Sequence, residues 1–230
     1  MPSAVTLASL ITRARDRADM TSSTFVTDAR LTDYINAELS ELYDLLVTAY
    51  EDYFVSTATM TLVGGTEAYN LPSNFYKLLK AFLREGAQRF LMRRFVVEDL
   101  SYSLEVADGV GSNNVNLRYR IMGGKIYFMP LPSIGGTVEL FYVPEFQTLI
   151  SPADVISFNV PVGWEDFVVS GAAARMLVKE ESDPSFLVAE KERCKQRIMH
   201  AATDRDLGEP NRITDKSGRY SGRASSMDGR

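Results

Sequence analysis

The stretch DARLTDYINAELSELYDLLVTAYEDYFVSTATMTL, residues 28–62, decides the fold because the spacing of its apolar residues changes partway along. In its first part an apolar residue recurs every three or four positions, as on one face of an α-helix. From Phe54 onward apolar residues alternate with threonines, which is the pattern of a β-strand. The stretch therefore predicts a helix that runs to about Tyr53, roughly 35 Å long, followed directly by a strand. The helical stripe consists of Leu31, Tyr34, Ile35, Leu39, Leu42, Leu46 and Tyr50.

Three further helices are predicted from the same kind of spacing. A short one precedes the long helix, whose first turn Thr27 or Asp28 can cap by accepting hydrogen bonds from free amides. A third runs from Trp164 to Glu180, and its run of small residues at 171–174 would let another helix approach closely. Asp183 and Pro184 are typical of a new helix start. The last helix is expected to bury Leu187, Cys194, Ile198 and Ala201.

The middle of the chain predicts antiparallel strands. Gly123 and Gly124 can form a two-residue turn, so residues 118–122 should pair with residues 125–129. A further strand is expected in TVELFYV, residues 137–143, which Pro144 ends.

These elements predict an α+β fold: a four-helix bundle with an inserted antiparallel β-rich subdomain and an extended C-terminal tail. Residues 1–53 would supply the first helical pair, 54–145 the inserted subdomain and 146–206 the second helical pair. Residues 207–230 are rich in Gly, Ser and Arg and poor in apolar residues. Such a segment cannot bury enough apolar surface to order itself alone.

Composition excludes several classes of function. The chain has 45% apolar residues and a net charge of −5, so broad attraction to nucleic acid is not expected. A single cysteine, Cys194, and a single histidine, His200, leave no intrachain disulfide and argue against zinc sites and Ser-His or Cys-His catalysis. No apolar run is long enough for a membrane helix, and the N-terminus does not resemble a signal peptide. We expect no catalytic, metal or cofactor site.

Two groups of charged residues suggest alternatives. Glu38, Glu41 and Asp44 could act as paired carboxylates of a peptidoglycan hydrolase, but we place them on the polar face of a helix, where solvation is the default. The substitutions Glu38→Gln, Glu41→Gln and Asp44→Asn should then change the free energy of unfolding by no more than about 0.5 kcal/mol. A nucleic-acid-binding module would instead use arginines on phosphate, which needs no base-reading motif. The candidates are Arg13, Arg15, Arg17, Arg89, Arg93 and Arg94.

Several phrases follow one another in order over nearly the whole chain. They are LTDYINAELSELYDLL, GGTEAYNLPSNFYKLLKAFL, RYRIMGGKIYFMPLP, VELFYVPEFQTL, PVGWEDFVVSGAAARMLVKEESDPS and AATDRD. In the order and spacing of these phrases the chain resembles the adaptor (connector, or tail accessory) proteins that join head to tail in tailed bacteriophages.

The resemblance implies a structural protein of the virion that assembles in the host cytoplasm. It implies a ring of twelve subunits below the portal protein, which continues the DNA channel and presents a surface to tail or nozzle proteins. Genomic DNA would pass without sequence-specific contact. The C-terminal tail would dock onto the portal through two apolar anchors and three charged contacts. These are Ile213 and Tyr220, with Arg212, Arg219 and Arg223.

Overall fold

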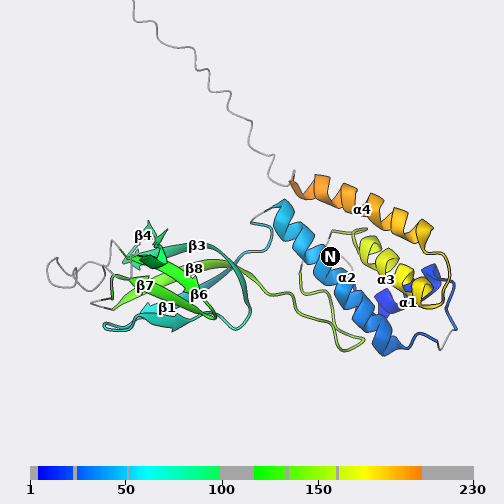
Figure 1. Ribbon diagram of the computed structural model, residues 1–230, viewed down its shortest axis with the longest axis horizontal. Coiled ribbons are helices and arrows are strands. Elements are labelled where there is room, and N and C mark those ends of the chain that lie inside the picture. Colours follow the sequence, from blue (N-terminus) through cyan, green and yellow to red (C-terminus); the bar gives the residue numbers. More distant parts are fainter. Residues whose placement is uncertain are drawn as a thin grey trace, which may run out of the picture.

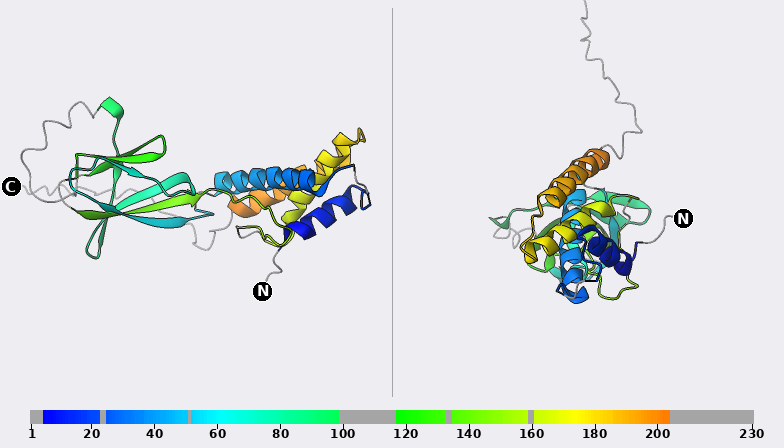
Figure 2. Two further views of the ribbon diagram at one scale, coloured as in Figure 1. Left: turned by 90° about the horizontal axis from the view of Figure 1, so that it is seen from below. Right: turned by 90° about the vertical axis from the view of Figure 1, so that its right-hand side faces the viewer.

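A computed structural model describes residues 5–22, 25–50, 52–98, 117–132, 135–158 and 161–203. The molecule is elongated, with the helices gathered at one end and the strands at the other (Figures 1 and 2). The α+β class predicted from the sequence is confirmed. We call the two ends the helical unit and the β-sandwich.

The helical unit contains α1 (Leu7–Arg17), α2 (Asp28–Ala49), α3 (Glu165–Lys179) and α4 (Ser185–Thr203). The long helix begins as predicted, because the Thr27 side chain accepts a hydrogen bond from the Arg30 backbone N–H. It ends earlier than predicted, at Ala49, since Tyr50 already has an extended backbone. At the start of α4, Asp183 accepts a hydrogen bond from the Ser185 N–H (2.9 Å), as expected for a cap.

The central element of the helical unit is α3, which packs against each of the other three helices. A helix that is apolar on all sides belongs in a core, and α3 is buried from Phe167 to Ala174. The four helices share one core, but a regular four-helix bundle is not shown, because one helix lies at the centre of the other three. In α4 the buried alanine is Ala202 and not Ala201, so that prediction was wrong by one residue.

The β-sandwich consists of two four-stranded sheets, in the orders β1-β8-β3-β4 and β2-β7-β6-β5. The first contains β1 (Ser56–Leu62), β8 (Gly136–Pro144), β3 (Phe75–Glu85) and β4 (Gln88–Leu91). The second contains β2 (Ala68–Asn70), β7 (Lys125–Met129), β6 (Arg118–Met122) and β5 (Arg93–Arg94). All pairings are antiparallel except that of β5 with β6.

The predicted hairpin is confirmed residue by residue, from Arg118 paired with Met129 to Met122 paired with Lys125. Gly123 has a φ of +60°, and only the first turn residue lies in the left-handed region, as in a type II′ turn. The two sheets pack their inner faces together through Leu83, Phe128 and Leu140. Alternation along each strand leaves the remaining side chains on the outer faces.

The helical unit and the β-sandwich meet at a joint formed mainly by aromatic rings. Tyr43 of α2 stacks on Phe54, with ring centroids 4.7 Å apart, and contacts Phe146 and Phe158. The Tyr43 hydroxyl donates a hydrogen bond to the Pro144 carbonyl at the end of β8 (2.5 Å). The chain thus leaves the helical unit after α2 and returns to it after β8. The predicted boundaries at residues 53, 145 and 206 stay predictions.

Within the described ranges, no helix is both long and apolar enough to cross a membrane. The predicted tail, residues 207–230, lies outside the described residues.

Candidate functional site

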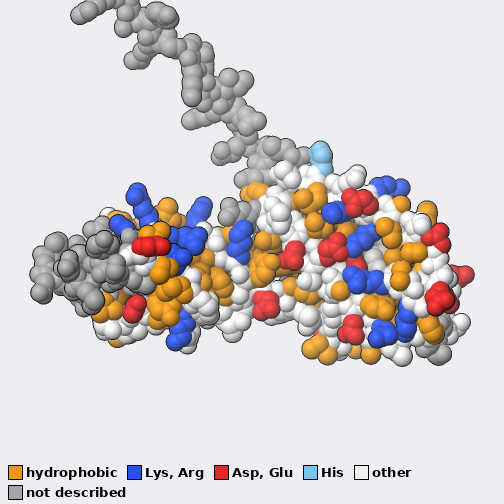
Figure 3. Space-filling view, viewed as in Figure 1, with side chains coloured by type: hydrophobic (Ala, Val, Ile, Leu, Met, Phe, Trp, Pro, Cys, Tyr) orange, Lys and Arg blue, Asp and Glu red, His pale blue; other side chains and the backbone are white. Residues whose placement is uncertain are grey.

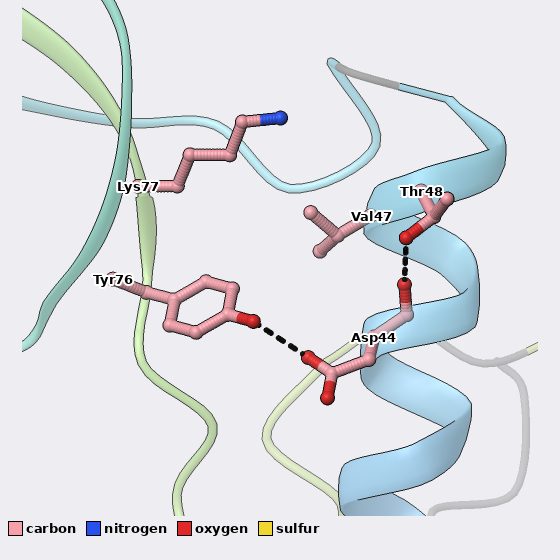
Figure 4. Close-up of a pocket in the computed structure, with 5 residues that line it drawn as sticks. All are labelled: Asp44, Val47, Thr48, Tyr76 and Lys77. Carbon is pink, nitrogen blue, oxygen red and sulfur yellow. Dashed lines mark hydrogen bonds between the residues drawn. The ribbon is translucent and has the colours of Figure 1, made fainter.

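An open concavity lies between α2 and the start of β3, beside the joint (Figure 4). Its volume is about 590 Å³, and Asp44, Val47, Thr48, Tyr76 and Lys77 line it. The Tyr76 hydroxyl donates a hydrogen bond across it to Asp44 Oδ1 (2.9 Å). Asp44 is therefore held by a neutral donor at the rim of an open hollow.

The two tyrosines beside this hollow do not provide a base at neutral pH. Burial, with smaller effects of Tyr76 and Asp44, raises the pKa of Tyr43 to about 12. The hydrogen bond to Asp44 is the main cause that raises the pKa of Tyr76. Both phenols therefore stay protonated and serve as hydrogen-bond donors.

Two further concavities continue along the exposed side of α2, and both also include Asp44. One contains Ala37, Ser40, Glu41 and Thr48, and the other reaches Phe146 at the joint. We define the open α2 face by the exposed or partly exposed residues Asp33, Ala37, Ser40, Glu41, Asp44 and Thr48. It is a hollowed, acidic surface made largely of small side chains, which suits binding of another molecule.

Glu38 is not on the polar face of α2, so that sequence-based placement was wrong. It is 1% exposed and lies between Arg175 of α3 and Lys191 of α4. Its Oε1 lies 2.7 Å from Arg175 Nε, and its Oε2 lies 2.6 Å from Lys191 Nζ. A Cβ atom at Gly171 would lie 2.1 Å from Glu38 Oε2, so glycine is needed there to make room for the carboxylate. The helical spacing of Leu31, Ile35, Glu38 and Leu42 is the signal that could have found this burial.

The three carboxylates do not converge as a hydrolase requires. Glu38 points into the helical core, Glu41 pairs with Lys191 (2.7 Å), and Asp44 bonds Tyr76. Glycoside hydrolysis needs two carboxyl groups that flank one sugar in a groove. No feature of these residues favours the hydrolase alternative.

The arginines proposed for phosphate contact divide into two groups. Arg13, Arg15 and Arg17 form ion pairs within the helical unit; Arg13, for example, lies 2.8 Å from Asp166. Arg89 pairs with Glu139 on the outer face of the first sheet (2.8 Å). Arg93 and Arg94 are exposed on β5. Lysine and arginine side chains gather on the visible side of the β-sandwich, whereas on the helical unit both signs are interspersed (Figure 3).

Cys194 and His200 lie on different sides of α4. Cys194 is buried, and burial is the main cause that raises the pKa of its thiol. His200 is exposed in the last turn. Within the described parts of the chain, no group of three or more His, Cys, Asp or Glu residues could hold a metal ion. The five proposed portal contacts, Arg212, Ile213, Arg219, Tyr220 and Arg223, lie outside the described residues.

Comparison with known protein families is informative. A protein-family model described as SU10 adaptor protein matches residues 5–224, which include the helical unit, the β-sandwich and most of the tail. No curated protein matches the chain.

Proposed function

The chain belongs to the SU10 adaptor protein family, which makes it a structural adaptor of a phage, and on that premise we propose that it joins the head to the tail. In this proposal twelve copies form a ring below the portal protein. The ring continues the DNA channel and provides the surface to which tail or nozzle proteins attach. The protein is incorporated into the virion after assembly in the host cytoplasm.

The observation that carries this proposal is the shape of the molecule together with the extent of the match. Two structurally different ends are held together by one aromatic joint, so a single subunit can contact different partners at its two ends (Figure 1). The concavities are open and lie along the side of α2. Such a surface favours contacts with macromolecules.

We assign portal docking to residues 207–230. Ile213 and Tyr220 are the apolar anchors, and Arg212, Arg219 and Arg223 are the charged contacts. Ordering a chain rich in Gly and Ser costs about 1–2 kcal/mol per residue, so local contacts alone are insufficient. Repetition around a ring would allow weak contacts to add up by multivalency.

Passing DNA is proposed to contact the ring through its phosphates alone. Of the six arginines that the sequence suggested for phosphate contact, Arg93 and Arg94 are the best placed to reach DNA. Both are exposed, and no carboxylate of a described residue pairs with them. Contacts with phosphate position a nucleic acid without reading its sequence.

Deletion of residues 207–230 tests the docking step. The truncated protein should unfold at nearly the same temperature as the full chain, yet fail to bind portal-bearing heads of the same virus. A matched control replaces only Ser217, Ser221 and Ser225 with alanine and should bind normally. Normal binding of the truncated protein would refute the docking role.

Cryo-electron microscopy of particles that carry the full chain tests the ring. Twelvefold density for the adaptor below the portal is expected. Isolated copies, or density without rotational symmetry, would contradict the proposal.

A further inference from the structure

We propose that the open α2 face of one copy docks against the outer face of α4 of a second copy. We define the outer face of α4 by Phe186, Ala189, Arg193, Gln196, Arg197 and His200. The inference rests on the proposed ring and names the surfaces that would meet at each contact within it.

The α2 side of the contact is a continuous stripe that carries uncompensated negative charge. Residues 33, 37, 40, 44 and 48 are spaced by three or four, so they lie on one side of the helix. Among the described residues, no lysine or arginine forms an ion pair with Asp33 or Asp44. Ala37, Ser40 and Thr48 are short, so a second helix can approach closely between these charges.

The α4 side carries the opposite charge on a matching stripe. The Arg193 side chain is 80% exposed, and its nearest carboxylate, Glu190, is 3.9 Å away. Arg197 donates a hydrogen bond to the Gly163 carbonyl (2.7 Å), and no described carboxylate pairs with it. Phe186, at the start of the stripe, is 78% exposed. A large exposed aromatic ring beside arginines is typical of protein interfaces.

Length and direction fit a side-by-side contact. The α2 stripe, residues 33–48, and the α4 stripe, residues 186–200, are each roughly 22 Å long. Both helices run toward the β-sandwich (Figure 1). Rotation about an axis along the molecule keeps α2 and α4 of neighbouring copies running in the same direction. Glu41 and Asp44 then lie level with Arg193 and Arg197.

The two faces cannot meet within one copy. Lys191, on the inner side of α4, is fixed to Glu38 and Glu41 of α2. The outer side of α4 therefore points away from α2 of the same chain, and a second copy is needed. Each copy would offer one face of each kind, which produces a head-to-tail contact that can close into a ring.

Charge reversal on the full chain tests the contact. One variant carries Asp33→Lys and Asp44→Lys, and the other carries Arg193→Glu and Arg197→Glu. Each variant used by itself places like charges on both sides of the contact. It should bind portal-bearing heads at least about tenfold more weakly than the wild type does. An equal mixture should recover binding, because the two variants can alternate around a ring with an even number of subunits. The control variant, Glu67→Lys with Lys125→Glu on exposed positions of the β-sandwich, should bind as the wild type does.

A second measurement does not depend on charge. Ala37→Cys and Ala189→Cys in one chain should produce a ladder of disulfide-linked copies on heads under oxidising conditions. Each single cysteine variant should not. If the mixture stays inactive although both variants fold, or if no cross-links form on assembled rings, the two faces do not meet and the inference is wrong. If the wild type itself forms no ring, the proposed function fails.

Discussion

The helical unit and the β-sandwich each contain a buried carboxylate that is neutralised in a different way, Glu38 in the first and Glu139 in the second. Glu38 is 1% exposed among three helices, where Arg175 and Lys191 neutralise it from different elements. Glu139 is 7% exposed on the outer face of a sheet and is paired with Arg89, a half-exposed side chain on an adjacent part of the same face. Within the apolar core of the helical unit, one carboxylate thus joins α2, α3 and α4. The core of the β-sandwich is built by side chains that alternate between the inner and outer faces along each strand. Its ion pair lies on an outer face, away from that core.

The largest expected effect comes from Glu38. Glu38→Gln should lower the free energy of unfolding of the helical unit by about 3 kcal/mol, because two cations lose the carboxylate that neutralises them. This replaces the expectation of a near-neutral change that the sequence suggested. Hydrogen exchange should accelerate in the helices and stay unchanged in the strands. Glu41→Gln is the control, and it should cost no more than about 0.5 kcal/mol, because exposed pairs contribute little. Equal effects of both substitutions would show that the buried ion pairs of Glu38 contribute no more than the exposed pair of Glu41.

Gly171→Ala should destabilise the helical unit by about 2 kcal/mol, since the added methyl group collides with the Glu38 carboxylate. At an exposed helical position the same substitution stabilises by about 0.5–1 kcal/mol. Urea unfolding of Gly171→Ala, of Glu38→Ala and of the double variant measures the coupling between the two residues. The cost of the double variant should be well below the sum of the two single costs. Simple additivity would show that the two residues do not compete for space.

In the β-sandwich we expect a smaller effect that stays local. Gly123→Ala places a side chain at a φ of +60° and should cost about 1 kcal/mol. Gly124→Ala is the matched control, because Gly124 lies outside the positive-φ region and has open space around it. Thermal unfolding checks both. The same cost for each glycine would contradict the assigned turn.

At the joint we expect an effect no larger than that of Gly123→Ala at neutral pH. Tyr43→Phe removes the hydrogen bond to Pro144 and should cost about 1 kcal/mol. The pKa of Tyr43 rises from 10.0 in the unfolded chain to about 12 in the folded protein. Its stabilising contribution is therefore complete below pH 10 and is lost between pH 10 and 12, where only the unfolded chain releases the proton. Urea unfolding should show the wild type losing its advantage over Tyr43→Phe in that range. A constant difference would contradict the raised pKa.

Sequence reasoning succeeded where the signal is local. The hairpin of residues 118–129 follows from two glycines and alternating side chains that are neighbours in the sequence. The start of α2 follows from Thr27 and its own first turn. Glu38 was misplaced because the residues that neutralise it, Arg175 and Lys191, come from the far end of the chain. The short strands β2, β4 and β5 were not predicted individually, since two to four residues carry too little periodic signal.

The insertion of the β-sandwich between α2 and α3 also fixes the order in which the protein can fold during synthesis. The last strand, β8, leaves the ribosome before α3 does, so the β-sandwich can close while the apolar stripe of α2 still lacks its partners. Because α3 is the centre of the helical core, α1 and α2 must wait for some 20 residues beyond Pro144 before that centre begins to emerge. Domains generally fold as units while the chain is made. The early closure of the β-sandwich also keeps the two ends of the insertion together, which shortens the search of α3 for α2.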